Sequence, residues 1–431
     1  MLLTVRDCCE PHDHVLKDDG RADIEDIALA VRAAEADAEA FFLRNHVTAG
    51  MRVLFETGLA RLDGRSKQAD FLLAQAMGGG KTHLMVAFAL IAKSPAVRQK
   101  VLDEAGMHIR TGFGAARVVA FSGRNNPDHY FWGEIAHQLG KGETAFNKHW
   151  LNGPKGPDEA AWMELIGDEP TVILIDEMAP WFRMAAAVQI AQGTLASHGE
   201  YALANLREAA RKLPRCILIG SSLAGTYGDE SRALHQIFAN VEGEAKRGAK
   251  VIEPVAVNND EIFEILKRRL FKKLATPDQV EDVAQAYALA MDEAVRSRAV
   301  ARTPEQYADD IRRCHPFQPS LREVISLFQN NERFRKTRGL LALMSAIVRC
   351  VWGEGRSNTV HLGAVAKVVE IGWWRSLWFV QRTISGVSAP AETTPWKRIT
   401  QRRNRTARRC LQGTPGLTRS RRASGTGCVA L

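Results

Sequence analysis

The hydrophobic pattern changes character three times along the chain. Residues 1–65 carry apolar positions at helical spacing, and residues 66–258 contain short, continuously apolar runs separated by helical segments. Residues 259–378 return to amphipathic helical patterns, and residues 379–431 have almost no apolar face. We therefore expect a helical lead-in, an α/β core, a helical lid domain and a basic tail without fixed structure.

The two helical regions can be described in more detail. A helix rich in Ala, Glu and Asp is expected over 21–43, and Thr48 is placed to cap the next helix. The lid is expected to start with a helix over 261–274, because the strand pattern stops before it. Further amphipathic segments complete the lid at 279–295, 320–331 and 339–352.

The core contains apolar runs that are typical of buried strands. The early runs are apolar without alternation, which indicates strands covered on both faces, and helical segments lie between them. This alternation predicts a three-layer α/β fold around a parallel sheet, the architecture of P-loop nucleotide-binding proteins. The runs lie at 71–76, 117–122, 171–176, 216–221 and 251–257.

The segment FLLAQAMGGGKTH is the main candidate for nucleotide binding, because a buried strand leads through a glycine-rich turn into a Lys-Thr pair and a helix. Glycines let backbone N–H groups form an anion-binding nest, and the helix adds its positive end. Lys81 is expected to be a solvent-facing charge that reaches the ATP phosphates, and Thr82 to bind Mg²⁺. The expected ATP-binding residues are Gln75, Met77, Gly78, Gly79, Gly80, Lys81, Thr82 and His83, of which His83 also has the character of a packing residue.

This motif departs from the usual pattern at one position. The phosphate-binding pattern has glycine five residues before the last glycine, where this chain has Gln75. Three consecutive glycines can compensate for it. The alternative is an ordinary glycine-rich turn that happens to precede Lys-Thr.

The run TVILIDE gives a second candidate, because it ends in Asp176 and Glu177. A carboxylate at the end of this strand can hold Mg²⁺, while the adjacent Glu177 can orient and deprotonate the attacking water. The pair therefore suits hydrolysis as well as binding. The alternative is that two acids simply end a strand at the solvent boundary.

Polar residues also follow two other strands. Ser221 and Ser222 end the fourth run, where a hydroxyl would face the γ-phosphate, and Ser221 is the preferred candidate. Asn125 follows the second run and is a candidate contact of Glu177. Serines also end strands as turn residues, so this alternative stays open.

The net charge of +9 is concentrated near the C-terminus. Ten Lys and Arg residues lie within 397–422 and no acid follows Glu392, so the rest of the chain is close to neutral. We expect DNA to be reached through partner proteins or through this tail, and not through a basic face of the folded body. A shifted reading frame in a truncated gene would also produce such a tail, and both readings stay open.

Cysteine usage and hydropathy indicate the cellular compartment in which the chain is expected. Seven cysteines without a C-x-x-C pair predict neither a disulfide framework nor a zinc site. No stretch is apolar enough to span a membrane, and the N-terminus has acids where a signal peptide needs an apolar run. We expect a cytoplasmic protein that does not bind membranes.

The order of these parts resembles an AAA+ ATPase of the additional-strand class. More narrowly, FFLRNHVTAGMRVLFETGLARL, GGGKTH, EIFEILKRRLF, HPFQPSLREVI and FRKTRGLLALM resemble the ATPase module called domain of unknown function 499, over about residues 5 to 355. Such modules are similar to ATPase subunits of bacterial phage-defence systems of the bacteriophage-exclusion kind. Members of this family are generally much longer than this chain.

The resemblance implies roles for two arginines. Arg338 would be the sensor 2 arginine of the lid, and Arg247 would be an arginine finger that reaches a neighbouring subunit. A homo-oligomer, or a subunit of a multi-protein defence complex, is therefore expected. Arginines are also common on solvated helix faces, which is the alternative for both.

The sequence thus predicts a magnesium-dependent ATPase that couples turnover to conformational change in a larger complex. The expected catalytic residues are Asp176, Glu177, Ser221, Arg247 and Arg338, with Thr82 and Asp176 as metal ligands. Two alternatives remain. One is a truncated or slow nucleotide-dependent scaffold or switch, and the other is a P-loop small-molecule kinase.

The first testable prediction concerns the tail. Deleting residues 385–431 should leave ATP binding intact and remove most of the salt-sensitive, sequence-independent DNA binding, because ten Lys and Arg residues that contact phosphates give a steep salt dependence. Anisotropy of a labelled duplex across a salt series measures DNA binding, and titration with a fluorescent ATP analogue measures ATP binding. An unchanged salt slope after the deletion would mean that the folded body itself carries the DNA-binding charges.

Overall fold

A computed structural model describes residues 3–17, 26–74, 80–190, 193–222, 232–254, 261–296, 303–323, 325 and 337–361. All of these residues belong to one compact unit that spans Met1–Val368. The expected tail, most of the lid segment 320–331 and the glycine-rich loop at 75–79 lie outside the described residues.

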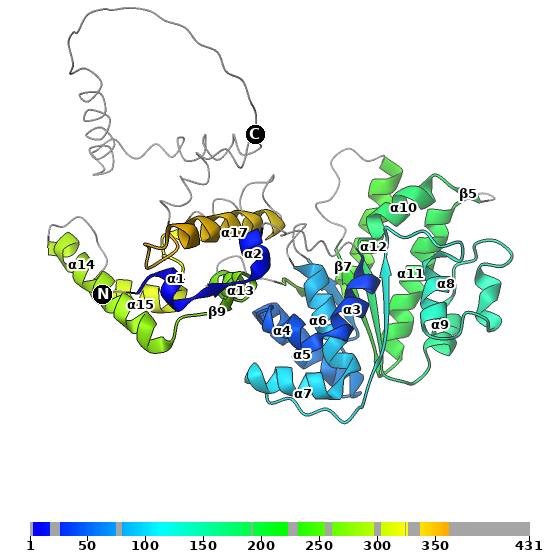
Figure 1. Cartoon of the computed structure of the whole chain (residues 1–431). Coiled ribbons are helices and arrows are strands. Elements are labelled where there is room, and N and C mark those ends of the chain that lie inside the picture. Colours follow the sequence, from blue (N-terminus) through cyan, green and yellow to red (C-terminus); the bar gives the residue numbers. More distant parts are fainter. Residues whose placement is uncertain are drawn as a thin grey trace, which may run out of the picture. The chain divides into compact units, whose positions relative to one another are not determined.

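A five-stranded parallel sheet forms the centre of the predicted core (Figure 1). Its order is β3-β4-β7-β2-β8, so β7 separates β2 from β4. The register places Leu73 beside Ser221 and Ser122 beside Asp176, which brings the carboxyl ends of the strands to one edge. This mixed α/β arrangement is compatible with the expected P-loop-like fold. The strands are β2 (Asp70–Leu73), β3 (Arg117–Ser122), β4 (Thr171–Asp176), β7 (Cys216–Ser221) and β8 (Lys250–Ile252).

Helices cover both faces of this sheet, because its strands are apolar on both sides. In β4, Val172 and Leu174 pack into one hydrophobic cluster, whereas Ile173 and Ile175 pack into the other. The first cluster contains α3 (Ile27–Ala36), α4 (Ala38–Leu43), α5 (Ala49–Leu62), α6 (Lys81–Lys93) and α7 (Pro95–Glu104). The second contains α8 (Tyr130–Gln138), the 3-10 helix η1 (Ala145–His149), α9 (Glu159–Ile166), α10 (Met178–Ala186), α11 (Leu195–Lys212) and α12 (Arg232–Gly248). A short hairpin of β5 (Gln189–Ile190) and β6 (Gly193–Thr194) joins α10 to α11.

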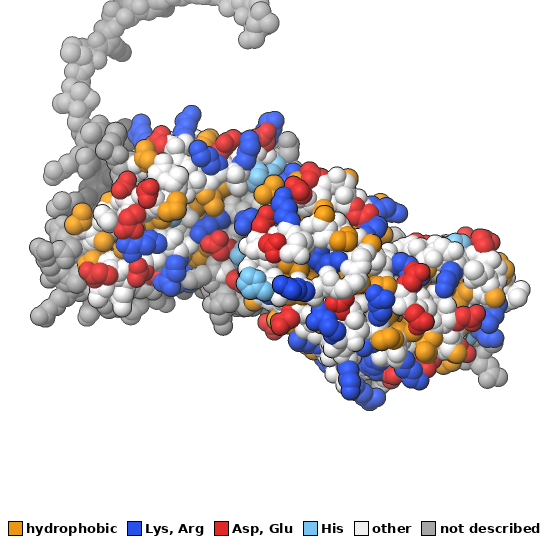
Figure 2. Space-filling model, turned by 90° about the horizontal axis from the view of Figure 1, so that it is seen from below, with side chains coloured by type: hydrophobic (Ala, Val, Ile, Leu, Met, Phe, Trp, Pro, Cys, Tyr) orange, Lys and Arg blue, Asp and Glu red, His pale blue; other side chains and the backbone are white. Residues whose placement is uncertain are grey.

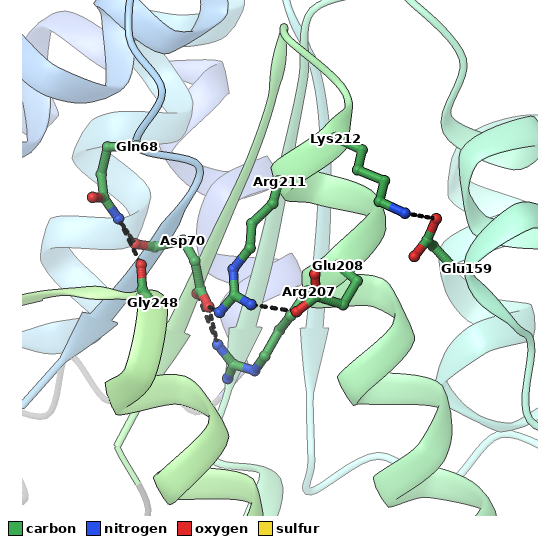
Figure 3. A network of polar contacts seen from close by, with 8 residues as sticks. All are labelled: Gln68, Asp70, Glu159, Arg207, Glu208, Arg211, Lys212 and Gly248. Atoms are coloured by element: carbon green, nitrogen blue, oxygen red, sulfur yellow. Dashed lines mark hydrogen bonds and ion pairs between the residues drawn. The ribbon is translucent and has the colours of Figure 1, made fainter.

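A buried ion pair ties the first residue of β2 to α11 (Figure 3). Nη1 of Arg207 donates to both carboxylate oxygens of Asp70, at 2.8 and 2.6 Å. The Asp70 side chain is fully buried and that of Arg207 is 6% exposed, so neither charge can exchange its partner for bulk water. Arg211 lies beside the pair, with Nη2 at 3.6 Å from Asp70. The start of β2 therefore depends on a charge match between sheet and helix.

A second buried arginine connects α5 with the end of α11. Arg61 is 4% exposed, and its guanidinium donates to the backbone carbonyls of Ala210, Arg211 and Leu213 at 2.5 to 2.9 Å. It also donates to Cys216 at the start of β7. These bonds satisfy carbonyls that a helix end leaves unpaired, and the positive charge lies at the negative end of the helix dipole.

The first residues of the chain pack with the helices that follow the sheet. β1 (Glu10–Pro11) pairs antiparallel with β9 (Phe271–Lys273), and Val5 N–H donates to the Ser357 carbonyl at 2.7 Å. The expected helical lead-in therefore has two parts. Its later helices α3 to α5 cover the sheet, whereas its first residues pack with the helices that follow the sheet. The described helices at the start of the chain and after the sheet are α1 (Val5–Cys8), α2 (Asp13–Lys17), α13 (Glu261–Leu270), α14 (Pro277–Arg296), α15 (Pro304–Cys314) and α17 (Thr337–Glu354).

Two helices differ from the sequence expectation. The helix expected over 21–43 is interrupted at Asp37, whose backbone leaves the helical region and whose side chain caps α4 by accepting from Ala40 N–H at 3.0 Å. The helix expected over 261–274 ends at Leu270, because the next three residues pair with β1. The Thr48 cap is confirmed, since its hydroxyl accepts from Met51 N–H at 3.2 Å.

The surface is mixed in charge. On the face shown in Figure 2, Lys and Arg side chains are interspersed with Asp and Glu side chains and with scattered hydrophobic ones. Among the helices described, none is both long enough and apolar enough to cross a membrane.

The Asp70–Arg207 pair gives a testable prediction for stability. Asp70→Asn should lower the free energy of unfolding by about 3–5 kcal/mol, because it leaves a buried guanidinium without its counter-charge. Urea unfolding measures the loss. Glu35→Gln, which removes the half-buried partner of the exposed Lys93, should cost about 1 kcal/mol or less.

A double variant tests the reason for that loss. Replacing both partners, as Asp70→Leu with Arg207→Met, should recover most of the stability, since no unpaired charge remains buried. Equal losses for Asp70→Asn and Glu35→Gln would contradict the role given to the buried pair.

Candidate functional site

Helix α6 begins at a glycine with a left-handed backbone. Gly80 has φ of 86°, a conformation that glycine adopts without the steric cost of a Cβ. Lys81, Thr82 and His83 form the first turn of α6, so the positive end of the helix dipole lies at these residues. Four predicted ATP-binding residues before it lie outside the described residues: Gln75, Met77, Gly78 and Gly79.

The first turn of α6 contacts the end of β4. The Thr82 hydroxyl donates to Oδ2 of Asp176 at 2.7 Å, and Asp176 is 4% exposed. Burial raises the pKa of Asp176, while hydrogen bonds from Thr82 and Ser221 and the charge of Lys81 oppose the shift. A carboxylate in this position favours a cation beside it. Its burial also argues against the alternative that Asp176 merely ends a strand at the solvent boundary.

Thr82 and Asp176 fit the preferences of Mg²⁺. This ion takes oxygen ligands and is usually held by one or two carboxylates, with water and substrate phosphates completing its shell. Within the described part of the chain, no group of three or more His, Cys, Asp or Glu side chains could hold a metal ion. The two residues predicted as metal ligands are therefore brought together as a partial site, of the type that a nucleotide's phosphates would complete.

Lys81 was expected to face solvent, but the structure shows it half-buried. Burial lowers the pKa of its ammonium group, and the charges of Asp176 and Glu177 oppose this shift. The charges of both acids therefore act on the ammonium group of Lys81. A phosphate that enters this site would compete with the acids for Lys81.

Glu177 has a strained backbone that three neighbours hold in place. Its φ of 49° is left-handed, which costs a non-glycine residue about 1–3 kcal/mol. Its N–H donates to Oγ of Ser221 and to Oδ1 of Asp176, both at 3.0 Å. Gly123 packs directly against it, since a Cβ on Gly123 would come within 2.2 Å of the Glu177 carbonyl oxygen. This conformation turns the Glu177 side chain toward the end of β3.

The Glu177 carboxylate forms an ion pair with Arg124, the second residue after β3. Nε of Arg124 donates to Oε2, and Nη2 donates to Oε1 at 3.5 Å. Sequence interpretation missed this residue and considered Asn125 instead, which donates to Asp26, the N-cap of α3. The available signal was a charged residue two positions after the apolar run 117–122.

The two serines at the end of β7 have different hydrogen-bond partners. Ser221, the candidate preferred from the sequence, contacts the Asp176–Glu177 pair. Ser222 points elsewhere and donates to Glu242 of α12 at 2.7 Å. The geometry therefore selects Ser221 as the strand-tip residue of this site.

The remaining candidate site residues either lie apart from Asp176 and Glu177 or have side chains outside the described part of the chain. Arg247 is exposed near the end of α12, which leads to the beginning of β8 and so to the opposite sheet edge from Asp176. A residue that acts on a neighbouring subunit need not approach its own site, so its role stays a prediction. Arg338 lies in the first turn of α17, and its side chain is outside the described part. The His83 ring stacks on Phe41 at 6.2 Å, as a packing residue would.

Comparison with known proteins bears on the helices after the sheet. Residues 257–361 match the family model described as "DUF499 second domain". This stretch contains α13, β9, α14, α15 and α17. No curated protein matches the chain. The match supports membership of the DUF499 class through this part of the chain.

Proposed function

We propose that the chain is a magnesium-dependent ATP hydrolase of the AAA+ P-loop kind. The observation that carries the proposal is the 2.7 Å hydrogen bond between Thr82 and the buried Asp176. It joins the positive end of a helix, which is suited to phosphate, to a carboxylate that is suited to a cation. The strand order supports the proposal, because β7 between β2 and β4 adds the hydroxyl of Ser221 to the same edge.

Each of these residues has a defined task in the proposed reaction. Lys81 and the N–H groups at the start of α6 bind the phosphates, and Thr82 and Asp176 hold Mg²⁺, which would neutralise charge on the phosphate oxygens. Glu177 orients the attacking water and accepts its proton. Ser221 positions Glu177 through the backbone N–H and senses the γ-phosphate.

Arg124 sets a condition on this reaction. The ion pair occupies the Glu177 carboxylate, so it has to loosen before that carboxylate can accept the proton of the attacking water. The γ-phosphate is an anion that can draw Arg124 away. The ion pair is also the observation that favours the alternative of a slow nucleotide-dependent switch or scaffold. A small-molecule kinase on the same fold remains a third and weaker alternative.

The biological setting rests on resemblance. We propose that the protein works in the cytoplasm, as a homo-oligomer or as a subunit of a larger complex in defence against phage. The resemblance to the DUF499 class, supported by the match at 257–361, carries this part of the proposal. Arg247 and Arg338 are the proposed arginine finger and sensor 2 residue.

Loss of Lys81 tests nucleotide binding. Lys81→Ala should abolish binding of a fluorescent ATP analogue, because it removes the full positive charge at the phosphate position. The fold should persist, since the change leaves the apolar clusters intact. Equilibrium titration measures the affinity, and thermal unfolding checks the fold. Unchanged affinity in a folded variant would remove the central claim.

Loss of the proposed base separates hydrolysis from binding. Glu177→Gln keeps the shape of the side chain but cannot accept a proton, so hydrolysis should fall by about 100-fold to 10,000-fold while ATP affinity stays near normal. Asp176→Asn should instead weaken the magnesium-dependent part of binding. Phosphate release under steady-state conditions, without any acceptor substrate, measures turnover.

Equal turnover in wild type and Glu177→Gln would contradict the hydrolase proposal. An active-site titration of the wild type would then distinguish a contaminating ATPase from an inert protein. A protein that binds ATP and does not turn it over would favour the switch, and phosphate transfer only to an added acceptor would favour the kinase.

A further inference from the structure

A cavity of about 430 Å³ lies beside the first turns of α9 and α11. These two helices pack on the face of the sheet that α6 does not cover, and Nε1 of Trp162 in α9 donates to the Ala202 carbonyl in α11 at 2.9 Å (Figure 1). The segment between η1 and α9 forms the third wall, with Lys148, His149 and Lys155. Among the described residues, those that line this cavity are all different from those of the proposed ATP site.

Hydrogen bonds hold the third wall in place without a ligand. Lys155 N–H donates to the His149 carbonyl at 3.1 Å, and Nδ1 of His149 donates to the Lys155 carbonyl at 2.9 Å. Nε1 of Trp132 donates to the same His149 carbonyl at 3.0 Å. Gly156 then packs directly against α11, since a Cβ on this residue would lie 2.6 Å from the His198 carbonyl oxygen. The cavity is therefore preformed, as small-molecule sites usually are.

His149 is a wall residue with an unsatisfied ring nitrogen. Its side chain is buried, and burial lowers the pKa of the imidazole, so the ring is neutral at neutral pH. Because Nδ1 donates to Lys155, Nε2 is left as an acceptor, and it has no hydrogen-bond partner among the described residues. A hydroxyl group that reaches this side of the ring would satisfy it.

The closed loop brings two lysines to the same cavity. Lys148 precedes His149 and Lys155 is hydrogen-bonded to it, so both ammonium groups extend from adjoining backbone. Both side chains are exposed, and within the described part of the chain neither forms an ion pair. Other exposed lysines are paired, such as Lys93 with Glu35 at 2.6 Å.

The carboxylates around the cavity already have partners. Asp158 lines the cavity and caps α9 through a hydrogen bond of 2.9 Å. The adjacent Glu159 pairs with Lys212 at 2.6 Å, and Glu200 accepts from Asn240 at 2.9 Å. Of the charged side chains that line the cavity, two are lysines and one is an aspartate, so the lining is positive.

Two helix N-termini add to this positive potential. Asp158 is the N-cap of α9, while Ser197 and His198 belong to the first four residues of α11. The positive ends of both helix dipoles therefore lie at the cavity that the two lysines also line. Cations are unfavourable at this end of a helix, so a purely structural role explains the lysines poorly. A bound anion would be stabilised by both helices and both lysines.

We propose that this cavity binds a small phosphate monoester. Such an ester carries about 1.5 to 2 negative charges at pH 7, which matches two ammonium groups better than a single carboxylate does. The cavity volume falls within the range of about 300–1,000 Å³ that is usual for small ligands. The hydroxyls of Ser197 and Tyr201 and the ring of Tyr201 would contact the organic part of the ester. The site is separate from the proposed ATP site and does not depend on it.

Isothermal titration of the full chain with phenyl phosphate tests the proposal. Lys148→Gln with Lys155→Gln removes both ammonium groups from the cavity. Lys93→Gln with Lys272→Gln is the charge-matched control, because carboxylates already hold these two lysines. Ser197→Phe places a bulky side chain in the cavity from an exposed position and leaves the charge unchanged. A separate titration with ATP is made on every protein.

Wild type should bind phenyl phosphate saturably. The cavity lysine variant should bind at least about tenfold more weakly, since each lost charge-assisted hydrogen bond weakens binding by about this factor. Ser197→Phe should abolish binding, and the control variant should keep the wild-type affinity. All four proteins should bind ATP equally.

Two natural esters identify the source of the phosphate. Adenosine 5′-monophosphate and glucose 6-phosphate are titrated into wild type and Ser197→Phe, and only binding that Ser197→Phe loses is assigned to the cavity. Preference for the first supports a nucleotide as the ligand, and preference for the second supports a sugar phosphate. The hydroxyl groups of both esters can also satisfy Nε2 of His149.

Failure of all three esters to bind wild type would overturn the proposal. Unchanged affinity in the cavity lysine variant, or equal losses in the two lysine variants, would overturn it as well. Benzoate has a ring and a single carboxylate, so benzoate binding as tight as that of phenyl phosphate would contradict a phosphate site. Because ATP binding is measured separately, these outcomes leave the proposed ATP hydrolysis untouched.

Discussion

The parallel register of β2, β7 and β4 is the constraint on which the candidate site depends. Because Leu73 lies beside Ser221 and β4 ends level with its neighbours, the residues that leave these strands share one edge. Asp176 then becomes buried, and hydrogen bonds from Thr82 and Ser221 together with the charge of Lys81 compensate its charge. A one-residue slip would reverse the side-chain directions and separate these groups. The buried ion pair at the other end of β2 helps to hold this alignment.

The backbone of Glu177 is held in a strained conformation, and its carboxylate is held by an ion pair. Its left-handed backbone and its bonds to Ser221 and Asp176 are the kind of local strain that surrounding structure must maintain, and such strain gathers at functional sites. Arg124, however, holds the carboxylate in an ion pair. The free-energy cost of breaking this pair therefore adds to the barrier of any reaction that uses Glu177 as a base. The same ion pair would keep ATP hydrolysis slow in the resting protein.

Sequence patterns predicted the centre of the fold better than its margins. The bounds of β3, β4 and β7 equal those of the apolar runs, because a strand buried on both faces shows its full length as hydrophobicity. Residues 271–273 form a strand only because β1 pairs with them, and no local pattern encodes a partner so distant in sequence. Thr82, Asp176 and Ser221 were found because strand ends and helix starts are visible in sequence. Arg124 was missed because its role depends on which strands become neighbours.

The pairing of β1 with β9 has a practical consequence for dissecting the chain. A shortened protein that starts at α3 would leave the backbone of β9 without its partner and would uncover the apolar surface that Val5 and Val15 now cover. Unpaired strand edges and freshly exposed apolar surface promote aggregation. Poor solubility of such a fragment would then reflect a broken sheet edge and not an unstable nucleotide site. A useful fragment has to keep both ends of this pairing or remove both.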